Sequence, residues 1–158
     1  MNENEFALCV QRLRSRLYRT AYMYLGSEAD ALEAVDEAVY KALRSLKKLR
    51  QPEFFDTWIT RILINECKTE LKRKRRFAPL EELPETAIEQ FDALPLKDAV
   101  SRLPADLKEP LILRYFAEYT VAQTAEALKI PQGTAATRLR RALSILRLEL
   151  SEEDYLHE

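Results

Sequence analysis

The sequence predicts an all-α protein made of two small helical domains that are joined by an acidic flexible linker. The chain has 158 residues but only two glycines, and such a composition favours helices over sheets. Apolar residues recur every three or four positions in two blocks, 6–76 and 96–150. Between the blocks, residues 77–95 hold three prolines and five acidic side chains, which no regular helix accommodates. We therefore expect domains at 1–76 and 96–150, a linker at 77–95 and a frayed acidic tail at 151–158.

Three helices are expected in the first domain. The first runs from Phe6 to Leu25, and Gly26 ends it. Ser27 and Asp30 have the spacing of a capping box, which starts a second helix through about Leu46. A third helix is expected over residues 52–76, because proline suits a first helical turn. The expected core positions of the first two helices are Phe6, Cys9, Leu13, Leu17, Ala21, Leu25, Leu32, Val35, Val39, Ala42 and Leu46.

Four helices are expected in the second domain, because its apolar pattern is interrupted at residues 103–104, 118–119 and 129–131. Capping-box spacing recurs twice, at Asp106 with Glu109 and at Thr120 with Gln123. The last helix has a regular apolar face that should be buried. Its members are Ala135, Leu139, Ala142 and Leu146.

Several function classes are disfavoured by what the sequence lacks. Cys9 and Cys67 belong to no metal-binding or disulfide spacing, so we expect two free core thiols, no metal site and no cofactor. The single histidine, His157, lies in the tail, and no phosphate loop or nucleophile constellation is present, so no enzyme is predicted. Catalysis by carboxylates alone stays open. An acidic start and the lack of a long apolar run predict a cytoplasmic protein.

A basic and polar face is expected on the third helix. It consists of Arg61, Asn65, Lys68, Lys72 and Arg76, at three- and four-residue steps. Three aromatic residues, Phe54, Phe55 and Trp58, lie beside it, and aromatic rings can hold unstacked bases. The pattern therefore favours nucleic-acid binding. The plain alternatives are a solvated charged helix end and a Trp58 that belongs to the core.

Residues 120–143 have the pattern of a helix-turn-helix, with two short helices around a three-residue junction at 129–131. Outside the apolar face of the second helix lie Thr134, Thr137, Arg138, Arg140 and Arg141. Such a helix fits the DNA major groove, where arginine can bond guanine through two hydrogen bonds. An ordinary helical hairpin with a cationic face would show the same spacing.

From about Leu17 to Leu148 the chain resembles the extracytoplasmic-function RNA polymerase sigma factors of the sigma-70 family. Residues 17–31 (LYRTAYMYLGSEADA) resemble the opening of sigma region 2, and residues 33–42 (EAVDEAVYKA) its acidic motif. Residues 58–65 (WITRILIN) are similar to the segment that captures the non-template strand of the minus-ten element. Residues 103–116 and the helix-turn-helix resemble region 4, which reads the minus-thirty-five element.

The resemblance implies a set of partners and a role for each group of residues. Polymerase binding, through the clamp helices of the beta-prime subunit, falls to Glu33, Asp36, Glu37 and Tyr40, and the beta flap is a further expected contact. Recognition of the minus-ten element falls to Arg61, Asn65, Lys68, Lys72, Arg50 and Trp58. Recognition of the minus-thirty-five element falls to Thr134, Thr137, Arg138, Arg140 and Arg141. A membrane-anchored anti-sigma factor is the expected restraint, and no small-molecule substrate is expected.

The chain departs from the family pattern at several positions. Asp36 stands where glutamine is usual, and Lys129 stands where glycine is common in the turn. Ala136 and Thr137 stand where a cation and then serine are frequent, and Arg140 is a candidate to compensate for the cation. The promoter sequence is therefore not transferable from relatives.

The expected function is transcription initiation. The factor would bind core polymerase, direct it to specific promoters and promote DNA melting, in a cell-envelope or other extracytoplasmic stress response. A free-standing dimeric helix-turn-helix regulator is the alternative, but it leaves the first domain without a purpose. A helical adaptor that binds protein alone is a third possibility. Initiation by core polymerase from a defined promoter separates the three.

Overall fold

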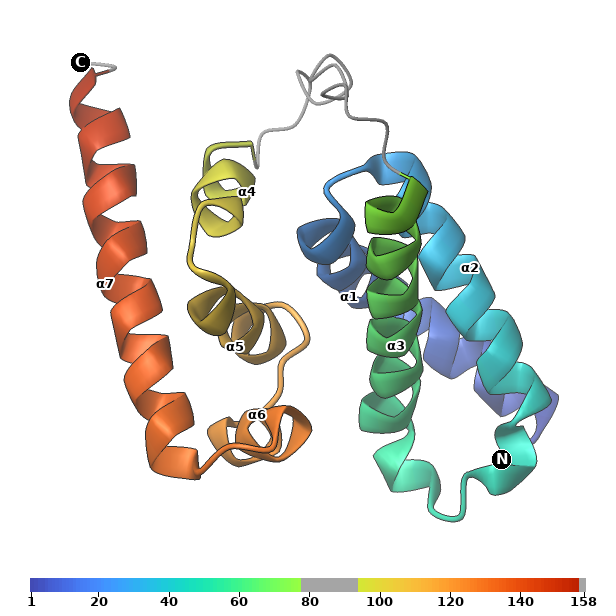
Figure 1. The fold of residues 1–158 in the computed structure, drawn as a ribbon. Helices are drawn as coiled ribbons and strands as arrows, with labels where there is room; N and C mark the ends of the chain where they lie inside the picture. The colour runs from blue at the N-terminus through green and yellow to red at the C-terminus, as the bar shows by residue number, and fades with distance from the viewer. Residues whose placement is uncertain (78–93, 157–158) are drawn as a thin grey trace. The chain divides into compact units, whose positions relative to one another are not determined.

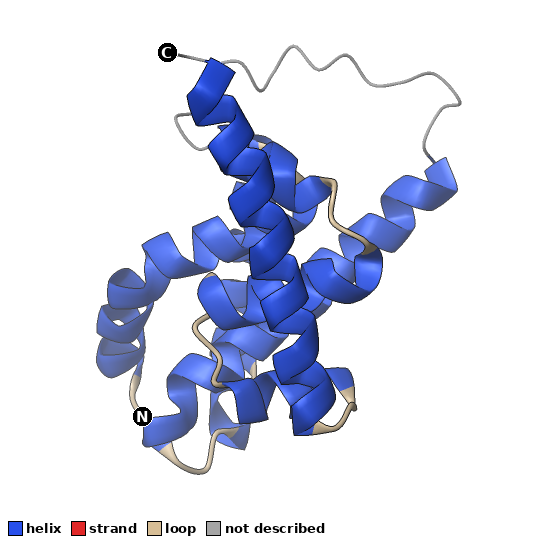
Figure 2. Cartoon of the chain, turned by 90° about the vertical axis from the view of Figure 1, so that its left-hand side faces the viewer, coloured by secondary structure: helices blue, strands red, loops and turns tan. Residues whose placement is uncertain are grey.

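The computed structural model describes residues 1–77 and 94–156. Its contacts divide the chain into two compact units, Met1–Pro84 and Glu85–Glu158. Helices and the loops between them make up all of the described residues, as the sequence predicts (Figure 2). No helix within 1–77 or 94–156 combines the length and apolarity that a membrane crossing needs. Most of the predicted linker lies outside the described residues, and the exact domain limits stay predictions.

Three long helices form the first unit (Figure 1). They are α1 (Glu3–Leu25), α2 (Glu28–Arg44) and α3 (Phe55–Phe77), with the short 3₁₀ helices η1 (Leu46–Lys48) and η2 (Pro52–Phe54) between α2 and α3. The first helix begins three residues earlier than expected, because Asn2 and Glu5 form a complete capping box. Gly26 ends α1 in the left-handed conformation, and the Ser27 hydroxyl caps α2 at the backbone N–H of Asp30.

The core of the first unit differs from the expected one on α2. Its buried face carries four alanines and a valine: Ala31, Ala34, Val35, Ala38 and Ala42. Of the expected core positions, Val35 and Ala42 are confirmed, but Leu32 is 49% exposed and Val39 and Leu46 are only half-buried, so these three were wrong. Small residues let α2 lie close to both α1 and α3. The large apolar side chains of the core come instead from Leu17, Phe55, Ile59 and Leu63, and the ring of Phe55 meets Phe6 edge to face.

Four helices make up the described part of the second unit: α4 (Leu94–Ser101), α5 (Ala105–Tyr115), α6 (Val121–Leu128) and α7 (Gln132–Leu156). The capping box at Thr120 and Gln123 is confirmed by both of its hydrogen bonds. The one expected at Asp106 and Glu109 was wrong, because α5 begins directly after Pro104 and Asp106 already lies in its first turn. Pro104 is the N-cap residue, and no side chain forms a capping hydrogen bond with the first turn.

The junction between α6 and α7 is closed by Lys129, whose backbone is left-handed (φ 57°, ψ 44°). The lysine itself therefore adopts the conformation that glycine would adopt most easily. On α7 the expected apolar face is confirmed, with Ala135 and Ala142 fully buried and Leu139 and Leu146 nearly so. The helix continues to Leu156, so the expected fraying from residue 151 is not observed up to that point.

Candidate nucleic-acid interface

One side of α3 is buried and the other is basic. Ile59 and Leu63 are fully buried in the unit. The opposite side exposes Arg61, Asn65, Lys68 and Lys72, the four described members of the expected basic face. The side chain of Arg76 lies outside the described residues. The helix thus presents cations and one amide over several turns, an arrangement suited to a single nucleic-acid strand.

The aromatic residues at the start of α3 are divided between the core and the surface. Phe55 is 1% exposed, whereas Phe54, in η2, is 57% exposed. Trp58 is half-buried, with its ring 5.9 Å from that of Phe55. Trp58 is therefore neither fully buried, as a core residue would be, nor fully exposed, as a base-binding surface residue would be. Arg50, exposed between η1 and η2, lies on the loop that leads into these rings.

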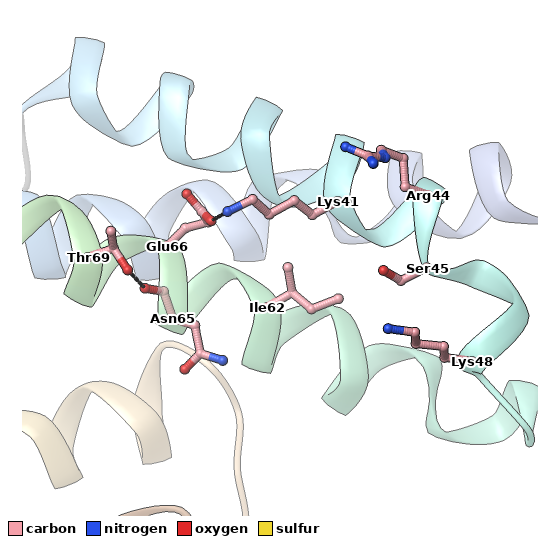
Figure 3. Close-up of a pocket in the computed structure, with 8 residues that line it drawn as sticks. All are labelled: Lys41, Arg44, Ser45, Lys48, Ile62, Asn65, Glu66 and Thr69. Carbon is pink, nitrogen blue, oxygen red and sulfur yellow. Dashed lines mark hydrogen bonds and ion pairs between the residues drawn. The ribbon is translucent and has the colours of Figure 1, made fainter.

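A basic groove separates the carboxyl end of α2 from α3 (Figure 3). Its volume is about 580 Å³, and its lining consists of Lys41, Arg44, Ser45, Lys48, Ile62, Asn65, Glu66 and Thr69. Within this lining, only Asn65 was expected from the sequence. The three cations on the α2 side recur at three- and four-residue steps, the same signal that revealed the face of α3, and that spacing would have found them.

The carboxylate in the basic groove is Glu66, which forms an ion pair with Lys41 across the two helices. The side chain of Glu66 is 16% exposed and that of Lys41 is 51% exposed. A hydrogen bond from Lys41 to Glu66 raises the pKa of the lysine. Figure 3 shows the Glu66 side chain reaching toward α2, whereas the amide of the adjacent Asn65 points away from it. The two neighbours therefore line the same groove with side chains that point in different directions.

A second groove between α2 and α3 has the opposite charge. Its volume is about 450 Å³, and its lining consists of Asp30, Glu33, Ala34, Asp36, Glu37, Glu66 and Glu70. Three of the four residues expected to bind polymerase lie here. The fourth, Tyr40, is 55% exposed, and the guanidinium of Arg44 lies 5.6 Å from the centre of its ring.

The carboxylates of the acidic groove differ in their pairing. Asp30 forms an ion pair with Lys74. Asp36 lies 3.3 Å from Arg14, so this departure from the family pattern gains an exposed ion pair with α1. Glu70 accepts hydrogen bonds from Arg73, which lower the pKa of its carboxyl. The structure gives Glu33 and Glu37 no ion pair with any described residue, and both are exposed.

The outer side of α7 carries the residues expected to read duplex DNA. Arg140 and Arg141 are exposed, while Thr134, Thr137 and Arg138 are half-buried. The Thr137 hydroxyl donates to the Gly133 carbonyl at 2.9 Å, and Arg140 donates to that hydroxyl at 3.4 Å. Arg141 makes no such contact among the described residues, so its five N–H groups are available for a partner.

The two cysteines lie in different surroundings. The structure contains no cluster of three or more potential metal-binding side chains within the described residues. Cys67 is fully buried, and burial raises the pKa of its thiol to about 12. Cys9 is half-buried rather than a core residue. The chemistry of the described surface is therefore that of charged and hydrogen-bonding groups.

Comparisons with known proteins agree with both units. Residues 9–77 match the family model for sigma-70 region 2, and residues 93–146 match that for sigma-70 region 4. RNA polymerase sigma factor SigV of Bacillus subtilis is 29% identical over 151 residues, which cover 92% of this chain and 91% of SigV. The ECF RNA polymerase sigma factor SigW of the same organism is 23% identical, over 96% of this chain and 91% of SigW.

The fold also has solved counterparts. The sigma factor RpoE from Bartonella quintana, in its complex with the anti-sigma factor NepR, superposes with a TM-score of 0.75. The identity is 21%, over 93% of this chain and 97% of RpoE. Two family models in the order region 2 then region 4, together with relatives matched over nearly their whole length, show the family. The chain belongs to the sigma-70 family of RNA polymerase sigma factors, in the extracytoplasmic-function group.

Proposed function

We propose that this chain initiates transcription by binding core RNA polymerase, directing it to specific promoters and helping to melt them. The observation that carries the proposal is the presence of two opposite grooves on one helix pair. The acidic groove offers unpaired Glu33 and Glu37 to a basic protein surface. The basic side of α3 offers cations and Asn65 to DNA. One unit therefore has separate surfaces for the enzyme and for its template.

Region 2 acts on the minus-ten element. Lys68 and Lys72 hold phosphates, while Asn65 and Arg61, with Arg50 and Trp58 nearby, capture a base that has left the stack. Capture of the base offsets an unstacking cost of a few kcal/mol. Melting is thus driven by binding energy, and no catalytic group is required.

Region 4 acts on the minus-thirty-five element through α7. Arg140 and Arg141 face outward, on the side opposite to Ala135 and Leu139, which are buried in the core. Thr134, Thr137 and Arg138 flank them and fix the helix on the phosphate backbone. The contact of Arg140 with Thr137 orders that guanidinium, which supports a role for Arg140 in place of the cation absent at Ala136.

Initiation in vitro tests the function directly. Purified core polymerase and this chain are mixed with supercoiled DNA fragments from the native genome, and transcript starts are mapped. We expect defined starts that share two upstream elements and that disappear without the chain. A dimeric regulator would bind DNA but would not make core polymerase initiate, and an adaptor would do neither.

The chain acts in the cytoplasm, where polymerase is found, and we propose that a membrane-anchored anti-sigma factor restrains it. This proposal rests on the family, of which one solved member is held by an anti-sigma factor. Affinity purification from uninduced native cells should recover a membrane protein with a cytoplasmic segment. Recovery of polymerase alone would contradict the proposal.

A further inference from the structure

The start of α3 is joined to α1 by two adjacent residues that line neither groove. The carboxylate of Asp56, in the first turn of α3, accepts two hydrogen bonds from the guanidinium of Arg12, at 2.8 and 3.2 Å. Arg16, one turn further along α1, lies 3.8 Å from the same carboxylate. The hydrogen bonding to Asp56 raises the pKa of Arg12. Beside this cluster, the ring of Phe55 meets that of Phe6 edge to face.

The loop before α3 has few polar contacts of its own. Residues 50–54, which include η2, are all exposed, and none of their side chains forms a hydrogen bond or ion pair with another described residue. A hydrogen bond from the N–H of Phe54 to the Gln51 carbonyl, at 3.0 Å, orders the backbone locally. The ring contact of Phe55 and the ion pair of Asp56 come directly after this loop and join its end to α1.

Two groups assigned to capture of the minus-ten base lie at this junction. Arg50 belongs to the loop, and Trp58 follows Asp56 on α3, with its ring 5.9 Å from that of Phe55. Capture is more favourable if these groups are already in place, because ordering a loop when the base arrives would cost conformational entropy. A contact that joins the end of the loop to α1 can supply that order without touching DNA.

We propose that Asp56 is a positioning residue for base capture, which acts through Arg12 to hold the loop 50–54 and Trp58 in place. This inference rests on the proposed function, because it concerns the same minus-ten base. The planar guanidinium of Arg12 binds the carboxylate through two hydrogen bonds, which fix direction as well as distance. Arg16 adds a second positive charge at longer range.

Trp58 is the only tryptophan of the chain, so its fluorescence reports on this junction in the purified protein. Asp56→Asn and Arg12→Gln should each shift the emission to longer wavelength and increase quenching by acrylamide, because the indole gains access to water. The double variant should behave like either single variant, because the two residues act as one pair. Unchanged emission and quenching in both single variants would overturn the proposal.

The second measurement uses holoenzyme, assembled from the full chain and core polymerase. The probes are two DNA forks whose single-stranded minus-ten extensions carry either the preferred base or a mismatch at the position assigned to Asn65. Asp56→Asn and Arg12→Gln should each reduce the preference for the correct base about twofold to fivefold, the range expected when an exposed ion pair is lost. Competition for core polymerase and binding to minus-thirty-five duplex should stay as in the wild type.

Arg14→Gln is the matched control, because Arg14 also forms an exposed ion pair from α1, but with Asp36 of α2, at 3.3 Å. It should leave the base preference and the Trp58 emission unchanged. Asp56→Glu, which keeps the carboxylate, should retain most of the preference. Equal losses of preference in Arg14→Gln and Arg12→Gln would indicate a general loosening of α1 and would contradict a specific role for Asp56.

A purely structural ion pair would give a different result. Asp56→Asn would then lower the melting temperature and weaken binding of both forks by the same factor, without changing their ratio.

Failure of the inference also differs from failure of the function. If wild-type holoenzyme does not distinguish the two forks, the proposed function is wrong. If it does, and Asn65→Ala loses the preference while Asp56→Asn keeps it, only the positioning role is wrong.

Discussion

Lys129 occupies a backbone conformation that costs a residue with a β-carbon about 1–2 kcal/mol. Part of this cost would be recovered in Lys129→Gly, but glycine also gains entropy in the unfolded chain. We therefore expect a net gain of roughly 0.5–1 kcal/mol in the free energy of unfolding of the second unit, read from the midpoint of urea denaturation. Lys129→Ala is the control, because it removes the charge without relieving the backbone. Equal stabilisation by alanine and glycine would show that charge, not conformation, is responsible.

Substitutions of Arg141 and Asn65 should impair different steps of initiation, because Arg141 is assigned to duplex DNA and Asn65 to a single strand. Arg141→Ala should cost about 1–3 kcal/mol in recruitment to the minus-thirty-five element, with relaxed preference at one base. Opening of complexes that are already recruited should persist. Asn65→Ala should leave closed complexes nearly intact and weaken capture of the minus-ten base, and a premelted promoter should not restore discrimination at that base.

Permanganate footprinting beside closed-complex binding, on one promoter, measures both steps. If Arg141→Ala blocked melting alone, or Asn65→Ala abolished duplex recruitment alone, the two units would have been assigned to the wrong elements.

At the scale of elements, α2 contributes one surface to each groove, and its acidic surface is assigned to polymerase. Glu37 is exposed and has no ion pair among the described residues, so its carboxylate is accessible to a basic partner. Glu37→Lys should weaken binding to core polymerase by about tenfold or more, because like charges would then oppose each other. Competition with a labelled sigma factor measures this change. Glu3→Lys, the same charge change on exposed surface outside the groove, should have little effect, and equal losses in both variants would remove the assignment.

The sequence predicted the helices better than it predicted their buried faces. Gly26, Thr120 and the apolar face of α7 are local signals, and each was confirmed. On α2, Val35 and Ala42 were predicted correctly but Leu32 was not, because leucine was assumed to be buried, whereas alanines make up most of the side of α2 that packs against α1 and α3. Which side of α2 is buried depends on how the three helices pack together, and the sequence of a single helix does not predict it.

The candidate site was predictable to the extent that it lies on one helix. The spacing of Arg61, Asn65, Lys68 and Lys72 is enough to place them on one exposed face. The groove was missed because its second side comes from α2 and η1, and a pattern within one helix says nothing about what faces it. The ion pair between Lys41 and Glu66 joins residues 25 positions apart, which only the tertiary structure brings together.

At the scale of the whole molecule, each of the two DNA-binding units is small, and core polymerase is needed to fix the distance between them. The isolated protein should therefore bind promoter duplex weakly, in the range of about 10⁻⁴–10⁻⁶ M that is typical of non-specific binding, and should gain specificity with core polymerase. Fluorescence anisotropy with matched and scrambled duplexes, with and without core enzyme, measures both. Tight sequence-specific binding by the chain alone, as a dimer in sedimentation, would instead support the regulator.

The alanine face of α2 also bears on how this protein can evolve. Substitution of Ala31, Ala38 or Ala42 by a larger residue would force neighbouring helices apart, so these positions have little freedom to vary. Leu32 and Leu43, on the outer side of the same helix, are 49% and 41% exposed and can change with little effect on folding. Lineages can therefore alter what α2 presents to other proteins while its inner side stays fixed. The protein can therefore acquire different binding partners through changes on the exposed side of α2 without losing its fold.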